Sequence, residues 1–148
     1  MNGELLDTSV LSLLTPGRPP VPLTLQAKLR GDAGGIFICA ITLMEIQQGI
    51  MNLRRTGSDS RATLIERWLV DSISRFGDRI LDFDAACARE AGRLSDAATS
   101  KGRHPGFPDI AIAATGCVPA LVRSIQPNAV SVQIEAGGVE SSKRARSR

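Results

Sequence analysis

Three acidic side chains stand at positions in this chain where they could do chemistry. Asp7 directly follows Leu5 and Leu6, Glu45 comes shortly after a longer apolar run, and Asp109 follows a proline. Ionised carboxylates that gather in one place repel each other unless a cation lies between them. Ligation by oxygen atoms alone, without histidine or cysteine, favours Mg²⁺ or Mn²⁺ over Zn²⁺. Because such an ion polarises a phosphodiester and activates water, the acids predict metal-assisted hydrolysis.

Each acid also has a purely structural interpretation, and spacing alone leaves both interpretations open. Asp7 is suited to cap a helix that begins at Thr8, and Asp109 is suited to complement the dipole of a helix that it opens. Thr42 and Glu45 match a capping box, with threonine at the N-cap and glutamate three residues later. The preference for a metal site that follows from the residues alone is modest.

The elements expected around these acids alternate between apolar strands and amphipathic helices. Predicted strands cover residues 5–6, 36–41, 79–83 and 130–134, and predicted helices cover residues 8–14, 23–30, 42–54, 85–99 (with Asp84 as N-cap) and 109–114. A further helix is expected after the turn at residues 57–60, with a buried stripe of Leu64, Ile65, Trp68, Leu69, Ile73 and Phe76. This alternation predicts an α/β fold with a parallel sheet that helices cover on both faces. The carboxyl ends of such strands meet at one edge, so Asp7, Glu45 and Asp109 can converge although 38 and 64 residues separate them.

The composition narrows the class of protein. A chain of 148 residues predicts one domain with a real core, and 3% aromatic residues argue against a base-stacking platform. Three cysteines without a close pair favour neither a disulfide framework nor a zinc site. The sequence shows no basic leader and no long apolar stretch, so we expect no signal peptide, no membrane span and a reducing, cytoplasmic location.

The net charge of +3 comes from the end of the chain. Residues 1–116 hold 13 basic and 13 acidic residues, whereas residues 117–148 hold 5 basic and 2 acidic ones. The sequence pI of about 9.1 therefore reflects this terminal segment and does not by itself predict a basic face for nucleic acid.

Three segments taken together resemble the PIN-domain family. They are residues 5–10 (Leu-Leu-Asp-Thr-Ser-Val), residues 40–50 (Ala-Ile-Thr-Leu-Met-Glu-Ile-Gln-Gln-Gly-Ile) and residues 108–115 (Pro-Asp-Ile-Ala-Ile-Ala-Ala-Thr). Within the family the chain is most similar to VapC-type toxins of type II toxin–antitoxin pairs, particularly the FitB-like branch. The resemblance covers about residues 4–116 and implies a PIN-like three-layer α/β/α sandwich with a central parallel sheet.

The same resemblance implies an activity and its site. Family members are Mg²⁺- or Mn²⁺-dependent endoribonucleases that cut RNA, commonly form homodimers and are neutralised by a cognate VapB-like antitoxin. Asp7 and Asp109 match the metal-ligand acids of the family, and Glu45 matches the third member of the catalytic acidic site. Thr8 and Ser9 stand after the first acid, where family members commonly present a hydroxyl.

The sequence departs from the family pattern after Thr115. There the family continues with a strand carrying Thr-Arg-Asn or Thr-Arg-Asp, whereas residues 116–123 read Gly-Cys-Val-Pro-Ala-Leu-Val-Arg, and no acid follows Asp109 until Glu135. We therefore expect a nuclease-like domain at residues 1–116 and a divergent, partly disordered segment at residues 117–148, with the closing strands missing or altered. One hypothesis is that the reading frame, or the end of the gene, changed near residue 116.

Two other functions remain open. A PIN-like domain without its fourth acid is expected to bind antitoxin or RNA without cutting. A phosphatase with an aspartyl nucleophile needs a second acid two positions after Asp7, and the residue there is Ser9, so this alternative is weak. If RNA is bound, Arg54, Arg55 and Arg103 are the arginines expected to contact its phosphates.

Overall fold

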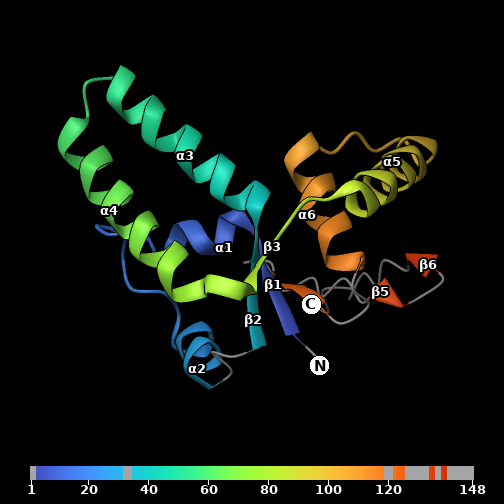
Figure 1. The fold of residues 1–148 in the computed structure, drawn as a ribbon, viewed down its shortest axis with the longest axis horizontal. Helices are drawn as coiled ribbons and strands as arrows, with labels where there is room; N and C mark the ends of the chain where they lie inside the picture. The colour runs from blue at the N-terminus through green and yellow to red at the C-terminus, as the bar shows by residue number, and fades with distance from the viewer. Residues whose placement is uncertain (1–2, 32–34, 119–121, 126–133, 136–137, 140–148) are drawn as a thin grey trace, which may run out of the picture.

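The computed structural model describes residues 3–31, 35–118, 122–125, 134–135 and 138–139. Its centre is a sheet of parallel strands in the order β3-β2-β1-β4 (Figure 1). The strands of this sheet are β1 (Gly3–Leu6), β2 (Ile36–Cys39), β3 (Ile80–Leu81) and β4 (Val122–Ile125). Two further short strands, β5 (Ile134–Glu135) and β6 (Gly138–Val139), pair with each other in antiparallel orientation.

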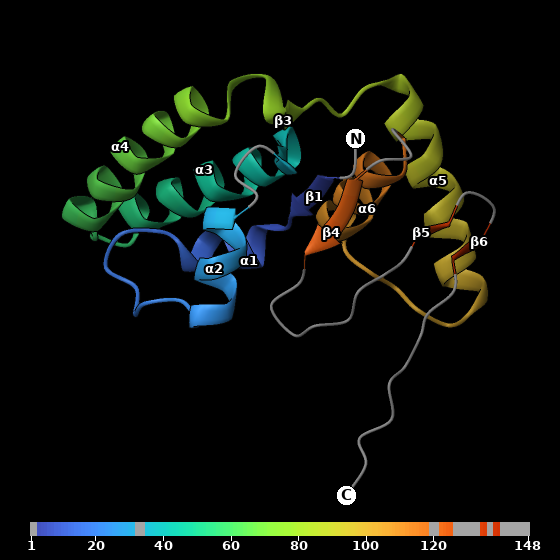
Figure 2. The same cartoon turned by 90° about the horizontal axis from the view of Figure 1, so that it is seen from below.

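Helices cover both faces of the sheet. They are α1 (Thr8–Leu13), α2 (Leu23–Gly31), α3 (Ala40–Arg55), α4 (Asp59–Phe76), α5 (Ala85–Ser100) and α6 (Phe107–Cys117), with a short 3-10 helix, η2 (Gly77–Arg79), before β3. Figures 1 and 2 both place α1 to α4 on one side of the sheet and α5 and α6 on the other.

The alternation of side chains along the strands explains these layers. Leu6 and Ile38 lie opposite each other in the sheet and belong to the larger core cluster, together with buried residues of α1, α3 and α4. Leu5 and Cys39 point to the other face, where they pack with Ile112 of α6. Successive residues of a strand face opposite sides, so a fully apolar strand needs cover on both. The predicted three-layer α/β/α sandwich is confirmed.

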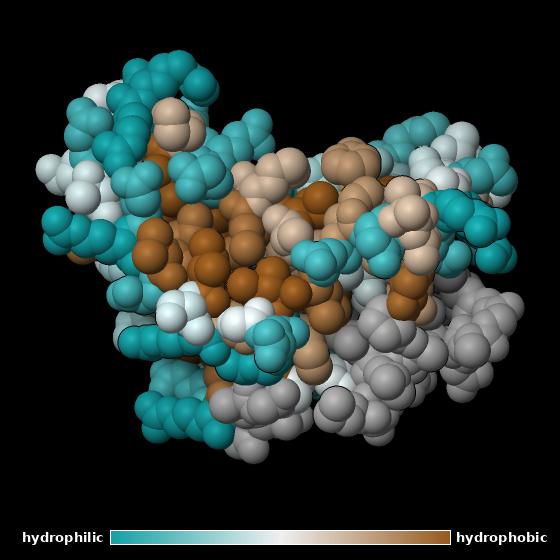
Figure 3. All heavy atoms as spheres, in the orientation of Figure 1, coloured by the Kyte–Doolittle hydropathy of each residue, from teal (hydrophilic) through white to brown (hydrophobic). Residues whose placement is uncertain are grey.

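The buried stripe of α4 differs in part from the predicted one. Ile65 and Leu69 are buried as expected, but Leu64 and Ile73 are 49% and 40% exposed. The buried face instead continues through the small residues Ala62 and Ser72. Residues adjacent in a helix point about 100° apart, so Leu64 cannot share the face of Ile65. In Figure 3, hydrophobic side chains gather on the visible face where Figure 1 draws α1, α3 and α4.

The capping box predicted at the start of α3 is wrong. The helix begins at Ala40, directly after β2, and its N-cap is Cys39, whose Sγ accepts a hydrogen bond from the backbone N–H of Ile41 at 3.4 Å. Thr42 therefore lies inside the first turn, fully buried, and its hydroxyl has no hydrogen-bond partner in the described part of the chain. The predicted strand at residues 36–41 ends two residues earlier than expected for the same reason.

Other boundaries agree more closely. Asp84 caps α5 as predicted, accepting a hydrogen bond from the N–H of Cys87 at 2.9 Å. The strand predicted at residues 79–83 shortens to β3, and α6 runs longer at both ends than the predicted residues 109–114. No helix among the described residues is long and apolar enough to cross a membrane. The three cysteines are free thiols.

The sheet continues past residue 116, where the sequence departs from the family pattern. Strand β4 pairs in parallel with β1 over four positions, from Gly3 opposite Val122 to Leu6 opposite Ile125. Of the strand predicted near residues 130–134, only Ile134 is described, at the start of β5. The disorder expected at residues 136–148 concerns positions that, apart from β6, lie outside the described residues.

Candidate active site

Asp7 stands at the junction between β1 and α1. It is the N-cap of α1, and its Oδ1 accepts a hydrogen bond from the backbone N–H of Val10 at 2.8 Å. Burial raises the pKa of Asp7 above its usual value, and the negative charge of Asp109 raises it further. The amides of Ser9 and Val10 act in the opposite direction without cancelling the shift. The structural interpretation of Asp7 as a helix cap is therefore confirmed, and the cap does not remove the cost of burying its charge.

Glu45 reaches the same region from α3. Because the helix begins at Ala40, Glu45 lies in its second turn and is not the capping partner that the sequence suggested. Its Oε2 instead accepts a hydrogen bond from the hydroxyl of Thr8, the first residue of α1. This contact joins two elements that are 37 residues apart in the sequence.

Asp109 comes from the opposite side of the sheet. It lies in the first turn of α6, where Pro108 also sits and where the helix dipole favours a negative charge. Asp109 and Asp7 line the same cavity, and the negative charge of Asp109 adds to the effect of burial on the pKa of Asp7.

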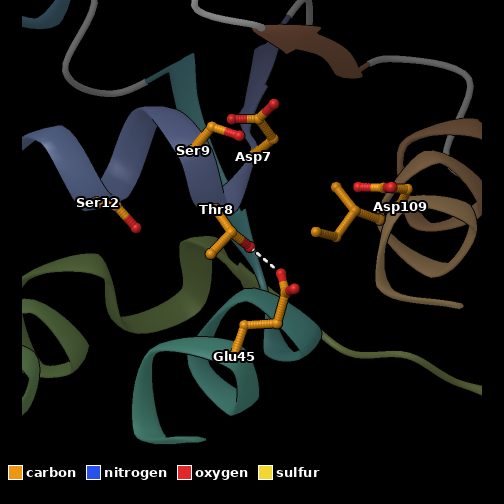
Figure 4. A pocket seen from close by; sticks show the side chains of 7 residues that line it. Asp7, Thr8, Ser9, Ser12, Glu45 and Asp109 are labelled. Carbon is orange, nitrogen blue, oxygen red and sulfur yellow. Dashed lines mark hydrogen bonds between the residues drawn. The ribbon is translucent and has the colours of Figure 1, made fainter. Parts of the chain in front are cut away.

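These three acids line one cavity of about 210 Å³. The cavity is lined by Asp7, Thr8, Ser9, Ser12, Glu45, Asp109 and Ile112. Figure 4 shows the acids arriving from the β1–α1 junction, from α3 and from α6. The structure thus brings together every residue that the sequence singled out for the site, at the carboxyl edge of the parallel strands, where open α/β sheets bind ligands.

The donor set of this cavity suits a hard divalent cation. Its polar lining consists of carboxylate and hydroxyl oxygens, the ligands that Mg²⁺ and Mn²⁺ prefer. A cation would also relieve the repulsion that raises the pKa of Asp7. Among the described residues, however, no group of three Asp, Glu, His or Cys side chains is close enough to ligate one ion. The three acids therefore line one cavity without forming a ready-made ligand set, and Thr8 holds Glu45 by a hydrogen bond.

Two features of the site were not predicted from the sequence. Ser12, one turn along α1 from Thr8, also lines the cavity. The spacing of four residues could have indicated this, because residues i and i+4 share one face of a helix. The arginines named as RNA contacts are partly engaged elsewhere: Arg54 forms an ion pair with Glu66, and Arg55 donates to the Oδ1 of Asn52 at 2.7 Å. The charge of Arg54 is therefore partly neutralised, whereas Arg55 keeps its charge because its partner is a neutral amide.

Comparison with known proteins is consistent with this geometry. The PIN-domain family matches residues 5–116, and the match ends where the sequence departs from the family pattern. A comparison with curated proteins gives no match. Among solved structures, the chain is similar to FitAcB from Neisseria gonorrhoeae, with 29% identity, a TM-score of 0.66, and coverage of 80% of this chain and 84% of that one.

Two VapBC structures share the fold at lower identity. VapBC2 from Rickettsia felis, solved bound to a DNA fragment from its promoter, is 22% identical with a TM-score of 0.61, covering 80% of this chain and 84% of that one. VapBC-5 from Mycobacterium tuberculosis, a member of the VapBC family of toxin–antitoxin systems, is 22% identical with a TM-score of 0.53, covering 82% and 83%. The family match extends over most of the chain, and the chain belongs to the PIN-domain family.

Proposed function

We propose that this protein is a VapC-type toxin, a metal-dependent endoribonuclease that hydrolyses RNA phosphodiesters. PIN domains are generally nucleases, and this chain belongs to that family. The observation that carries the proposal is the cavity in which Asp7, Glu45 and Asp109 meet from three separate elements. An acidic cavity cannot hold an RNA phosphate unless a cation intervenes, so the site and a divalent metal belong together.

The chain's own residues divide the work between holding the ion and orienting the reactants. Asp7 and Asp109 are the residues that would hold Mg²⁺ or Mn²⁺, because both line the acidic cavity and match the metal-ligand acids of the family. When bound, the ion supplies charge stabilisation and an activated water. Glu45, the third acid, accepts a hydrogen bond from the hydroxyl of Thr8 and would help to orient a water molecule in the cavity. The N-cap contact with Val10 fixes the carboxylate of Asp7.

Partners follow from the kinship with VapBC and FitAB proteins. We expect a small VapB-like antitoxin to neutralise the protein in the cytoplasm, and we expect the toxin to be a homodimer. Expression with and without the product of a neighbouring small gene tests the first point: toxicity that the neighbour relieves supports it. Light scattering on the purified protein tests the second.

Asparagine variants test the acidic site directly. Asp7→Asn and Asp109→Asn keep the shape of the side chains and remove their charges, so each should lower Mn²⁺-dependent RNA cleavage by roughly 100-fold or more. Asp96→Asn is the matched control, because Asp96 is exposed in α5 and does not line the cavity. Full cleavage activity in either of the first two variants would show that the site is assigned wrongly.

A second candidate is a PIN domain that binds RNA or antitoxin without cutting. It is favoured by the absence of any acid between Asp109 and Glu135, where the family pattern places a fourth one. Calorimetric titration with Mn²⁺ and a cleavage assay on the same sample separate the two candidates. Metal binding that Asp109→Asn weakens, without cleavage by the unmodified protein, favours the non-cutting form.

A further inference from the structure

A second cavity continues from the acidic one. It has a volume of about 280 Å³ and shares three lining residues with the acidic cavity, namely Thr8, Ser12 and Glu45. Two sets of its lining residues are distinctive: arginines, called here the arginine wall, and apolar side chains, called the apolar wall. A ligand that reaches the acids along this direction therefore also meets these walls.

The arginine wall consists of Arg18 and Arg61. Both side chains are exposed, and within the described part of the chain neither forms a hydrogen bond or an ion pair. This distinguishes them from Arg54, which is paired with Glu66. A guanidinium without a carboxylate partner is free to take a phosphate, whose oxygens match its planar array of donors.

The apolar wall is built mainly by α3 and α4. Its buried residues are Ile46 (7% exposed), Ile50 (1%) and Ile65 (8%), which form the apolar floor of the cavity together with Leu53. Gly49 lies between them on α3, and a Cβ atom added there would meet no atom within 4 Å. Glycine inside a helix is unfavourable, so this position forgoes helix stability while leaving the cavity open.

We propose that this second cavity binds the nucleotide next to the scissile phosphate of the RNA. Arg18 and Arg61 hold its phosphate, and its ribose or base rests on the floor of Ile46, Ile50, Leu53 and Ile65. The inference rests on the proposed function. RNA carries a phosphate at every nucleotide, so a strand that presents one phosphate to the acids brings the next to an adjoining cavity. An acidic peptide has no such regular repeat, so the arrangement of the two cavities favours RNA.

Charge variants test the arginine wall. Binding of a short single-stranded RNA is measured by fluorescence anisotropy at several salt concentrations, in the Asp109→Asn background so that the RNA stays intact. Arg18→Gln with Arg61→Gln should weaken binding about tenfold and reduce the salt slope by roughly 0.7 for each phosphate that the protein no longer neutralises. Arg67→Gln is the matched control: it removes the same charge from an exposed position of α4 that does not line the cavity.

Cleavage kinetics give an independent readout in the otherwise unmodified protein. Because the arginines contact a part of the substrate that does not react, the double variant should raise KM about tenfold and change kcat little. A fall in kcat with unchanged KM would overturn the proposal.

A steric plug tests the apolar wall. Gly49→Leu extends a side chain from this position and should raise KM about tenfold. It should not lower the Tm, because its Cβ meets no atom within 4 Å and leucine favours a helix more than glycine does. Gly92→Leu is the matched control, since Gly92 lies within α5, has equally open space at its Cβ and is far in sequence from the cavity. Equal KM values for the two glycine variants would overturn the proposal.

The outcomes also separate this inference from the proposed function. Cleavage by the unmodified protein, with RNA binding no weaker in the double arginine variant than in Arg67→Gln, refutes the second cavity and leaves the nuclease intact. RNA binding that depends on Arg18 and Arg61 without any cleavage supports the cavity and refutes the nuclease. Arginine variants that lose antitoxin binding but keep RNA binding would assign the cavity to the protein partner and overturn the proposal.

Discussion

Asp7 caps a helix and also lines the acidic cavity. Its Oδ1 caps α1 through the N–H of Val10, while its charge lies in a partly buried cavity near Asp109. A capping aspartate with no such neighbours normally has a lowered pKa, as Asp84 at the start of α5 does. The raised pKa of Asp7 therefore marks a position that is less favourable for an anion than a simple cap would be.

This difference predicts how stability depends on pH. The pKa of Asp7 is raised in the folded state, so the folded protein binds this proton more strongly than the unfolded chain does. The destabilising effect of its charge is absent below the unfolded pKa of about 4 and fully present above the folded pKa. Asp7→Asn keeps an effective cap, so its Tm should exceed that of the unmodified protein by about 1–3 °C at pH 7. Thermal unfolding between pH 4 and pH 7 measures the effect.

The pH series contains its own check. The difference in Tm between Asp7→Asn and the unmodified protein should shrink as the pH falls, and Mn²⁺ should narrow it at pH 7 by stabilising only the charged site. If the Tm of Asp7→Asn were instead lower than that of the unmodified protein, by an amount that grows with pH, the charge of Asp7 would be net stabilising without metal.

The acids of the site could be predicted from the sequence, but their contacts could not. The sequence alone shows that Asp7, Glu45 and Asp109 stand next to apolar segments and match family motifs. The hydrogen bond from Thr8 to Glu45 depends on how α1 and α3 meet in space. Local patterns instead paired Glu45 with Thr42, a prediction that fails because Cys39 already caps the helix.

At the level of elements, one buried contact links the two sides of the site. The Sγ of Cys39, at the β2–α3 junction, donates to the hydroxyl oxygen of Thr115 in α6 at 3.3 Å. That hydroxyl in turn donates to the carbonyl oxygen of Ala111 at 2.8 Å. Cys39 leads into the helix that carries Glu45, and Thr115 belongs to the helix that carries Asp109, so the contact fixes these helices relative to each other.

A double-mutant cycle measures this link. Cys39→Ala and Thr115→Val each remove one partner of a buried hydrogen bond and should lower the free energy of unfolding by about 1–3 kcal/mol. Since the partners share one contact, the double variant should cost less than the sum of the single ones by about 0.5–1 kcal/mol. Urea unfolding gives the values, with Cys39→Ala and Gly92→Ala as a distant, additive control pair. Additivity at positions 39 and 115 would contradict the coupling.

The elements themselves followed from periodicity, with errors at their ends. Continuous apolar runs and helical spacing placed β2, α3, α4 and α5 in the right order, because these patterns reflect which faces are buried. The ends depend on single contacts. Helix α6 begins at Phe107 because Pro108 fits the first turn, and β2 stops at Cys39 because its side chain serves the next helix.

At the scale of the whole molecule, β4 lies outside the segment that matches the family and yet belongs to the sheet. The match ends at residue 116, whereas β4 spans Val122–Ile125 and pairs with β1. β4 therefore makes β1 an interior strand, with neighbours on both sides. The predicted domain boundary at residue 116 stays a prediction, but a cut there would remove one strand of the sheet.

Two truncations test the contribution of β4. A chain ending at Cys117 lacks the backbone ladder between β1 and β4 and should be less stable by about 2–4 kcal/mol, for several hydrogen bonds worth about 1 kcal/mol each. A chain ending at Asn128 keeps β4 and serves as the control for removing the terminal charge. Urea unfolding of the two shortened chains gives the difference, and equal stability would show that β4 adds nothing to the sheet.

The layered architecture was predictable as a whole because it follows from alternating elements. The presence of β4 was not, since Pro119 and Pro127 stand on either side of it and interrupt the strand pattern in the sequence. Pairing with the exposed edge of β1 supplies what the local sequence lacks. Tertiary context, which a single sequence does not display, determines such short strands.

The pairing of β4 with β1 has an evolutionary consequence. A backbone ladder accepts almost any sequence that tolerates an extended conformation, whereas a catalytic carboxylate can be supplied only by aspartate or glutamate. Mutation at this end of the gene is thus able to erase a reactive group while selection on folding detects little change. Selection on β4 therefore acts mainly on its backbone conformation, whereas selection on a reactive carboxylate acts on the side chain itself.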